Sequence, residues 1–286
     1  VLEADRLAGQ TGDVLVDLTA TQYPMPDDPA GGKVTISDQA VLLPLRALQV
    51  LQAQGQRVII DTGAGRLEVP PEALMSQQLL TLGSTGMVRI VLKEAAEGVV
   101  LTAQAESGGR PSAALTGFAA PVRLTLRYGR GLLPDYLGVY LLDPASGEWV
   151  YADGRVDRAA RTITAALVQP GQYAVREYRE RFDDVPPTHW AYGDVQRMAA
   201  RQIVKGTAPG QFSPDAQVTR AQFAAMLVRA LGLKAERQIA IVPFDDVPPT
   251  AWYRAEVETA AFAGLVKGDN RLFRPDDPVT RQELAV

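Results

Sequence analysis

Cysteine is absent from the 286-residue chain, and histidine occurs once, at His189. The lack of cysteine excludes a disulfide framework, thiolate metal ligands and a cysteine nucleophile. A single histidine excludes a metal site built from several histidines, and any serine triad would depend on His189. These absences remove several classes of enzyme and metal-dependent domain, while they leave the cellular compartment open.

Long hydrophobic runs and a surplus of positive charge are also missing. No stretch approaches the roughly 20 consecutive apolar residues that cross a bilayer. The chain has 29 basic against 33 acidic residues, a formal net charge of −4, whereas nucleic-acid-binding domains usually carry a basic surplus. We therefore expect neither a membrane span nor a nucleic-acid partner. Because no charged and apolar leader pattern follows Val1, we also expect a mature or trimmed form.

What is present changes character near residue 178. Residues 1–177 contain short apolar runs between turn residues, and residues 122–128 alternate apolar and polar side chains as a half-buried strand does. A helix is predicted at Pro44–Gln54, with Pro44 near its first turn and Gly55 as its stop. The expected strands are 58–61, 66–69, 87–95, 99–107, 122–128, 137–143, 148–152, 161–168 and 172–176. We predict a mainly-β, β-sandwich-like module of one or two subdomains with one helix, followed by a linker at 178–181.

No catalytic constellation stands out in residues 1–177. The acidic residues are scattered, and most of them lie in turns, where aspartate accepts backbone hydrogen bonds. A paired-carboxylate glycosidase site is the less favoured alternative. Four aromatic residues could form a sugar-stacking face, but we favour cross-strand core pairs. They are Tyr136, Tyr140, Trp149 and Tyr151.

The remaining sequence is an internal repeat, which we assign to residues 182–243 and 244–286. The sequence of residues 182–188, Phe-Asp-Asp-Val-Pro-Pro-Thr, recurs at 244–250. The offset between the copies is 62 up to a shared Lys-Gly pair and 61 after it, as a single deletion would produce. The second copy stops within a predicted helix, so we expect a truncated repeat and a fragment of a longer polypeptide.

Each copy has the pattern of two helices, which predicts an all-α unit. The first helix is expected from Trp190 to Val204, with Lys205 in its last turn and Gly206 as a left-handed cap. Thr219 should be the N-cap of the second helix, because Gln222 three residues later completes a capping box. Thr280 and Glu283 repeat this pattern in the second copy.

Several residues of the repeats have both a structural and a binding interpretation. Arg220 and Arg281 occupy the first helical position, where a cation is mildly unfavourable, so each either pairs with an acid or receives an anion. Trp190 and Trp252 are candidate sugar platforms, although a large aromatic residue at a helix start is more often core. The positions of Lys205 and Lys267 have a sufficient structural explanation, because a cation is favourable at the C-terminal end of a helix.

The ordered motifs resemble the S-layer homology (SLH) domain over residues 182–286. They are Phe-Asp-Asp-Val, Trp, Val-Lys-Gly, Phe-x-Pro-Asp and Val-Thr-Arg, each present twice. The resemblance implies repeats that typically come in threes, pack as a pseudo-threefold helical unit and anchor proteins non-covalently to the bacterial cell envelope. In many Gram-positive members the ligand is a pyruvylated secondary cell-wall polysaccharide. Residues 121–175 are weakly similar to β-rich modules that often precede such repeats.

By position, the resemblance makes Arg220 and Arg281 the partners of the acidic pyruvate ketal. Trp190 and Trp252 would pack against sugar or shape the groove, while Lys205-Gly206 and Lys267-Gly268 would supply further polar contacts. The family's grooves lie between neighbouring repeats, so we do not expect every pocket to be complete in this chain.

The first functional hypothesis is thus an extracellular, non-catalytic anchor in the cell wall or S-layer of a Gram-positive bacterium. A surface-anchored carbohydrate-active enzyme fragment is the second, and a subunit of a self-assembling array or filament, joined through edge strands such as the one at 13–19, is the third. No cofactor is expected. Calcium at the acidic pairs 183–184, 245–246 and 276–277 is a weaker alternative to capping of helices and turns.

Overall fold

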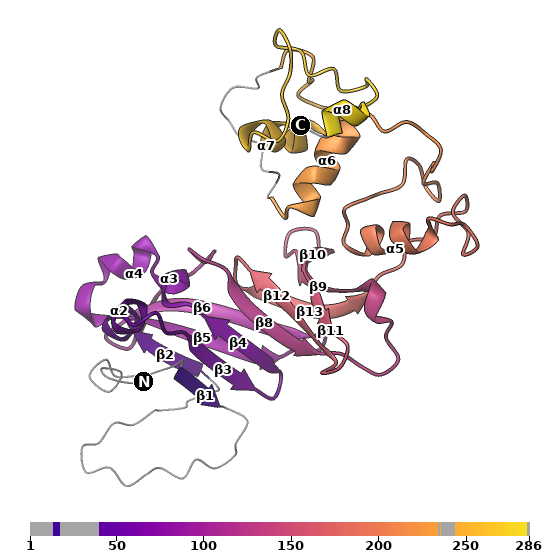
Figure 1. Ribbon diagram of the computed structural model, residues 1–286. Helices are drawn as coiled ribbons and strands as arrows, with labels where there is room; N and C mark the ends of the chain where they lie inside the picture. Colours follow the sequence, from indigo (N-terminus) through magenta and orange to yellow (C-terminus); the bar gives the residue numbers. More distant parts are fainter. Residues whose placement is uncertain (1–13, 18–39, 234, 236–243, 285–286) are drawn as a thin grey trace, which may run out of the picture. The chain divides into compact units, whose positions relative to one another are not determined.

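The computed structural model describes residues 14–17, 40–233, 235 and 244–284. The chain divides into two units, Val1–Glu177 and Tyr178–Val286, coloured indigo to pink and orange to yellow in Figure 1. Within the described ranges, no helix combines the length and the apolar character that crossing a membrane requires.

The first unit contains two β-sheets (Figure 1). One sheet has the order β1 (Val14–Asp17), β3 (Val58–Thr62), β4 (Gly65–Val69), β8 (Val122–Arg127), β12 (Thr162–Leu167) and β11 (Arg155–Asp157). The other has the order β10 (Trp149–Asp153), β9 (Leu137–Leu142), β13 (Gly171–Glu177), β6 (Val99–Ser107), β5 (Gly86–Glu94) and β2 (Ala40–Pro44), with β7 (Arg110–Ala114) also paired to β6. All described pairings are antiparallel except that of β1 with β3.

Both sheets bury side chains in one hydrophobic core. Leu124 of β8 and Ile90 of β5 are almost completely buried in it, and so are Leu48 and Leu51 of helix α2 (Leu45–Ala53). Each fully buried leucine contributes about 1.5–3 kcal/mol of transfer free energy. Two sheets around a shared core are consistent with the predicted β-sandwich.

The sequence pattern predicted most of these elements. The helix expected at Pro44–Gln54 is α2, and the expected hairpins are β3–β4 and β5–β6. The expected edge strand at 13–19 is represented by β1 at the end of its sheet, and its other positions lie outside the described residues. Elements without a predicted counterpart are β2, β7, β11, α3 (Pro71–Leu74), α4 (Gln77–Thr81), η1 (Gly83–Thr85) and η2 (Pro134–Tyr136).

The second unit contains helices joined by long turns. They are α5 (Tyr192–Ala200), α6 (Arg220–Ala230), α7 (Arg254–Phe262) and α8 (Arg281–Leu284). Isolated β-bridges also join Ala208 to Gln211, Asp269 to Leu272 and Thr219 to Pro278. The predicted all-α unit is therefore confirmed only in its helical content.

Hydrophobic packing in this unit crosses the boundary between the repeats. Helix α6, the second helix of repeat one, shares a cluster with α7, the first helix of repeat two, through Ala224, Val228 and Val257. Helix α5 instead packs in a separate cluster through Val195 and Ala199. The α6–α7 pair is thus held together by side chains from both repeats.

Candidate functional site

One aspartate fixes the central loop of each repeat. The carboxylate of Asp184 accepts the amide of Phe212 at 2.9 and 3.1 Å and the amide of Ser213 at 2.6 Å. Asp246 accepts the two equivalent amides of repeat two at 2.7 and 2.6 Å. Hydrogen bonds to a carboxylate are roughly twice as strong as neutral ones. The second aspartate of each Asp-Asp pair therefore ties the start of its repeat to the loop.

The same loop has an uncommon backbone conformation. Ser213 and Arg274 have φ angles of 61° and 58°, in the left-handed region, where a residue with a side chain is disfavoured by roughly 1–2 kcal/mol. The backbone hydrogen bond from Phe212 is the main cause of a lowered pKa at Asp184. At neutral pH the charged carboxylate thus holds a turn that is unfavourable on its own.

Gly206 and Gly268 lie where a larger side chain does not fit. A β-carbon on Gly206 would come within 2.5 Å of the Gln211 carbonyl oxygen and 3.0 Å of the Phe182 ring. On Gly268 it would come within 2.5 Å of the Leu272 carbonyl oxygen. Neither glycine has a φ in the left-handed region, so the predicted left-handed cap at Gly206 is wrong. Close approach of chain segments explains both glycines.

The first helix of repeat one is shorter than predicted. It ends at Ala200, not Val204, because Gln202 adopts a φ of 52°. Gly264 occupies the equivalent position in repeat two with a φ of 72°. Lys205 therefore lies in the loop beyond the helix, where its side chain is exposed, and the prediction that it belongs to the last helical turn is wrong.

The second helices begin as the sequence predicts. Thr219 and Gln222 form a complete capping box at α6, and α6 ends just before Gly232, whose φ is 63°. Thr280 and Glu283 exchange the equivalent bonds at α8, at 2.8 and 3.2 Å. This agreement reflects a local signal, since both partners of the box are three residues apart in sequence.

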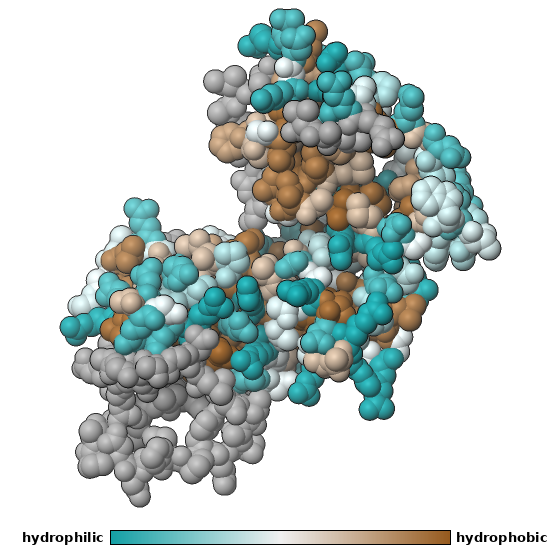
Figure 2. Space-filling view, viewed as in Figure 1, coloured by the Kyte–Doolittle hydropathy of each residue, from teal (hydrophilic) through white to brown (hydrophobic). Residues whose placement is uncertain are grey.

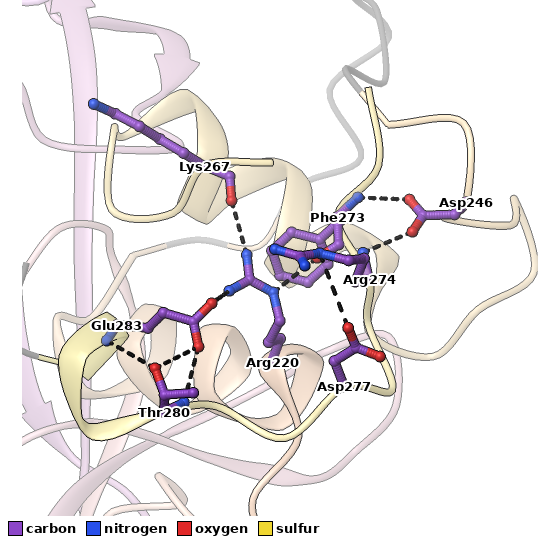
Figure 3. A network of polar contacts seen from close by, with 8 residues as sticks. All are labelled: Arg220, Asp246, Lys267, Phe273, Arg274, Asp277, Thr280 and Glu283. Carbon is purple, nitrogen blue, oxygen red and sulfur yellow. Dashed lines mark hydrogen bonds and ion pairs between the residues drawn. The ribbon is translucent and has the colours of Figure 1, made fainter. Parts of the chain in front are cut away.

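Arg220 connects repeat one to repeat two (Figure 3). Its Nε donates to the Phe273 carbonyl and its Nη2 to the Lys267 carbonyl, each at 2.8 Å, while Nη1 pairs with the Glu283 carboxylate. The guanidinium carbon also lies 5.1 Å from the centre of the Phe273 ring. With its side chain only 12% exposed, Arg220 is largely engaged inside the protein.

The remaining predicted site residues occupy different environments. Arg281 begins α8, but its side chain lies outside the described residues. The side chain of Lys267 is exposed and points away from the Arg220 network in Figure 3, where only its carbonyl takes part. The structure thus brings Arg220 and the Lys267–Gly268 backbone together, and it places Lys205–Gly206 in the corresponding loop of the other repeat.

Trp190 and Trp252 are surface residues. Trp190 is 88% exposed and Trp252 60% exposed, so they are not core residues. Trp190 stacks on His189 with ring centres 5.8 Å apart, and Trp252 meets Tyr253 edge-on at 5.3 Å. Figure 2 shows hydrophobic side chains at the surface of this unit beside hydrophilic ones. Two exposed aromatic residues at equivalent positions can offer apolar faces to a ligand.

Two residues of the Arg220 network are not among the site residues that the sequence predicts: Glu283, expected only as a capping residue, and Arg274. Hydrogen bonds from Thr280 are the main reason that the pKa of Glu283 is lowered, with the charges of Arg220 and Arg274 as further causes. The side chain of Arg274 is half exposed, and its Nε lies 3.9 Å from Asp277 Oδ2. Since Arg274 replaces Ser213 of repeat one, comparison of the two copies was the signal that could have identified it.

The acidic pairs are used within the repeats. Asp245 forms a two-pronged ion pair with Arg271, at 2.9 and 2.7 Å, which is the first cause of its lowered pKa. Asp183 pairs with Arg181 at 3.0 Å. Among the described residues, no three acidic or histidine side chains converge in a way that could hold a metal ion. Calcium binding stays a prediction.

Comparison with known proteins shows which known domain has the repeated pattern. A sequence profile of the S-layer homology domain matches residues 181–224 and 243–285. S-layer protein sap of Bacillus anthracis is 31% identical over 126 residues, which cover 44% of this chain and 15% of that protein. The matched ranges include the Asp-Asp pair, the loop that it holds and the Val-Thr-Arg motif of each repeat.

Similar segments also occur in proteins named as enzymes. Amylopullulanase of Thermoanaerobacterium thermosulfurigenes is 30% identical over 243 residues, 83% of this chain but 13% of that protein. Endo-1,4-beta-xylanase A of Thermoanaerobacterium saccharolyticum is 39% identical over 103 residues, 36% of this chain and 9% of that protein. The chain thus spans a small part of these relatives, and the first match is too long to be confined to the repeats.

Proposed function

Because residues 181–285 are S-layer homology repeats that follow a β-rich region, we propose that this chain anchors a bacterial surface protein to the cell wall. The attachment is non-covalent and is made by the repeats. The similarity to S-layer protein sap supports a location at the cell surface, and we place the protein in a Gram-positive wall.

The proposed ligand is an acidic, pyruvylated secondary cell-wall polysaccharide. The single observation that carries this proposal is the exposure of Trp190 and Trp252 at equivalent positions of two repeats. Exposed indole rings bury the apolar face of a sugar at little cost in side-chain entropy. The network that Arg220 organises at the repeat boundary, together with Arg281, is the proposed cationic complement to a ligand carboxylate, although the Arg220 side chain is itself mostly engaged by protein groups. The loops at Lys205–Gly206 and Lys267–Gly268 border the site.

We further propose that the described region is not catalytic. Proteins named as an amylopullulanase, a xylanase and an S-layer protein all contain the repeat segment. Because these names describe different activities, we attribute the shared segment to attachment rather than to one reaction. The match to amylopullulanase extends into the β-rich unit, and we propose a non-catalytic role for that unit as well.

Retention on purified cell walls tests the anchoring proposal. The full chain should sediment with walls, and the double variant Trp190→Ala, Trp252→Ala should be retained roughly tenfold less, because stacking contributes about 0.5–1.5 kcal/mol for each ring. Phe262→Ala is the matched control, since Phe262 is also 83% exposed but lies outside the proposed site. Equal loss in the double variant and the control would contradict the site, and no retention of the unmodified chain would contradict the function.

A further inference from the structure

Arg274 occupies a position at which the two repeats differ in chemistry but not in backbone. Its equivalent is Ser213, and both residues have left-handed φ angles near 60° with their amides held by the loop aspartate at 2.6 Å. The Ser213 hydroxyl is used internally, because it lies 2.7 Å from the Thr207 hydroxyl. Repeat two therefore presents a long cationic side chain where repeat one has a short, hydrogen-bonded one.

The guanidinium of Arg274 is the accessible cation of the network in Figure 3. Its side chain is 50% exposed, and the one acidic group of the described residues within 4 Å of its guanidinium is that of Asp277, whose Oδ2 lies 3.9 Å from Nε, beyond hydrogen-bond distance. Glu283 interacts with it only through its charge. Arg220, in contrast, is 12% exposed and donates to two carbonyls and to Glu283. A ligand carboxylate can reach Arg274 without breaking any hydrogen bond of the protein.

Arg220 holds the segment that carries Arg274. Its Nε donates to the carbonyl of Phe273, the residue just before Arg274, and its guanidinium lies over the Phe273 ring. Asp246 fixes the Arg274 amide from the other side. Because the backbone of Arg274 is already fixed on both sides, less conformational entropy is lost when its side chain binds a ligand.

A residue with a side chain in the left-handed region needs an explanation. Arg271, on the same loop, also has a positive φ of 62°, but its guanidinium is satisfied by the two-pronged pair with Asp245. For Arg274, the bond to Asp246 accounts for the backbone, as the bond to Asp184 does for Ser213, but among the described residues no group accepts a hydrogen bond from its guanidinium. The free donors of the Arg274 guanidinium, and not its backbone conformation, therefore point to a ligand.

We propose that Arg274 is the residue of repeat two that contacts the acidic groups of the wall polysaccharide, and that Arg220 is a positioning residue behind it. This inference rests on the proposed function and refines it, because the contact is made by a side chain that repeat one lacks. The two repeats would then differ in their affinity for carboxylated sugars.

The test uses two substitutions that each replace an arginine by its counterpart in repeat one. Arg274→Ser and Arg271→Gly both remove one positive charge from the same loop, and Ser213 and Gly210 show that each new residue suits the left-handed backbone. Binding of the full chain to purified wall polysaccharide is measured with its carboxylates intact and after their conversion to amides. Thermal unfolding confirms that both variants are folded.

We expect Arg274→Ser to weaken binding to the intact polysaccharide about tenfold, as the loss of one charge-assisted hydrogen bond does. Arg271→Gly should stay within about twofold of the unmodified chain, and the difference between the variants should vanish on the amidated polysaccharide. Equal affinities of both variants for intact polysaccharide, or a difference that survives amidation, would overturn the inference alone. Failure of the unmodified chain to bind either polysaccharide would overturn the proposed function and the inference with it.

Discussion

Asp184 and Asp246 each determine the course of a loop that is far from them in sequence. Each carboxylate accepts the amides of two consecutive residues, the second of which is in the left-handed region. The bond to Phe212 is also the first cause of the lowered pKa of Asp184. Loop shape and carboxylate ionisation are therefore coupled at the scale of one residue.

The sign of this coupling gives a pH prediction. Folding favours the charged form of Asp184, so its contribution to stability is present above the ordinary aspartate pKa of about 3.9 and is lost as the pH falls through the lowered folded-state value. Amide hydrogen exchange at Phe212 and Ser213, corrected for intrinsic rates, should lose protection below about pH 4. Asp184→Asn should lose that protection at pH 7 already.

Asp183→Asn is the matched control for this change, since the side chain of Asp183 is 59% exposed and bonds to Arg181 instead of to the loop. In the Asp183→Asn variant, the protection of the Phe212 and Ser213 amides should equal that in the unmodified chain at each pH. Unchanged protection in Asp184→Asn at pH 7 would show that the carboxylate does not hold the loop.

At the scale of elements, helix packing does not follow the repeat boundary. Val257 of α7 is fully buried against α6, whereas Val195 of α5 lies in its own cluster. Val257→Ala should destabilise the unit by about 2 kcal/mol through lost burial and an unfilled cavity. Hydrogen exchange should then accelerate in both α6 and α7 and remain unchanged in α5.

Val195→Ala provides the converse experiment. It truncates the same residue type at the corresponding position of repeat one, where 6% of Val195 is exposed, and it should accelerate exchange in α5 alone. Similar effects of both variants on all three helices would mean that the repeats pack as one cooperative core and would contradict the separate clusters.

Many of the helices and strands are predictable from local signals in the sequence. Alternating polarity located β8, and the Thr219–Gln222 spacing located the start of α6, because each depends on neighbours in sequence. The end of α5 was missed because Gln202 has no glycine or proline signal, although Gly264 marks the same position in the other copy.

The candidate site was less predictable because its contacts are long-range. Arg220 meets Phe273 and Glu283, more than fifty residues away in the chain, and no spacing rule connects them. Gly206 was assigned to a cap, while its actual constraint comes from the Gln211 carbonyl and the Phe182 ring. The exposure of Trp190 opposed the usual expectation that an aromatic residue at a helix start is buried.

At the scale of the molecule, a β-rich unit and an SLH unit occur in one chain. The match that covers 83% of this chain occupies 13% of an amylopullulanase, so the two units together are a small part of that relative. We infer that the repeats supply attachment and that the β-rich unit accompanies them. Self-association through sheet edges such as β1 stays a prediction.

Co-sedimentation of the full chain with native walls and with walls stripped of their secondary polysaccharide tests the anchoring claim most directly. The account predicts strong retention on native walls and a loss of at least tenfold on stripped walls, because the proposed ligand is the secondary polysaccharide and not another wall component. Equal retention on both preparations, or none on native walls, would contradict it.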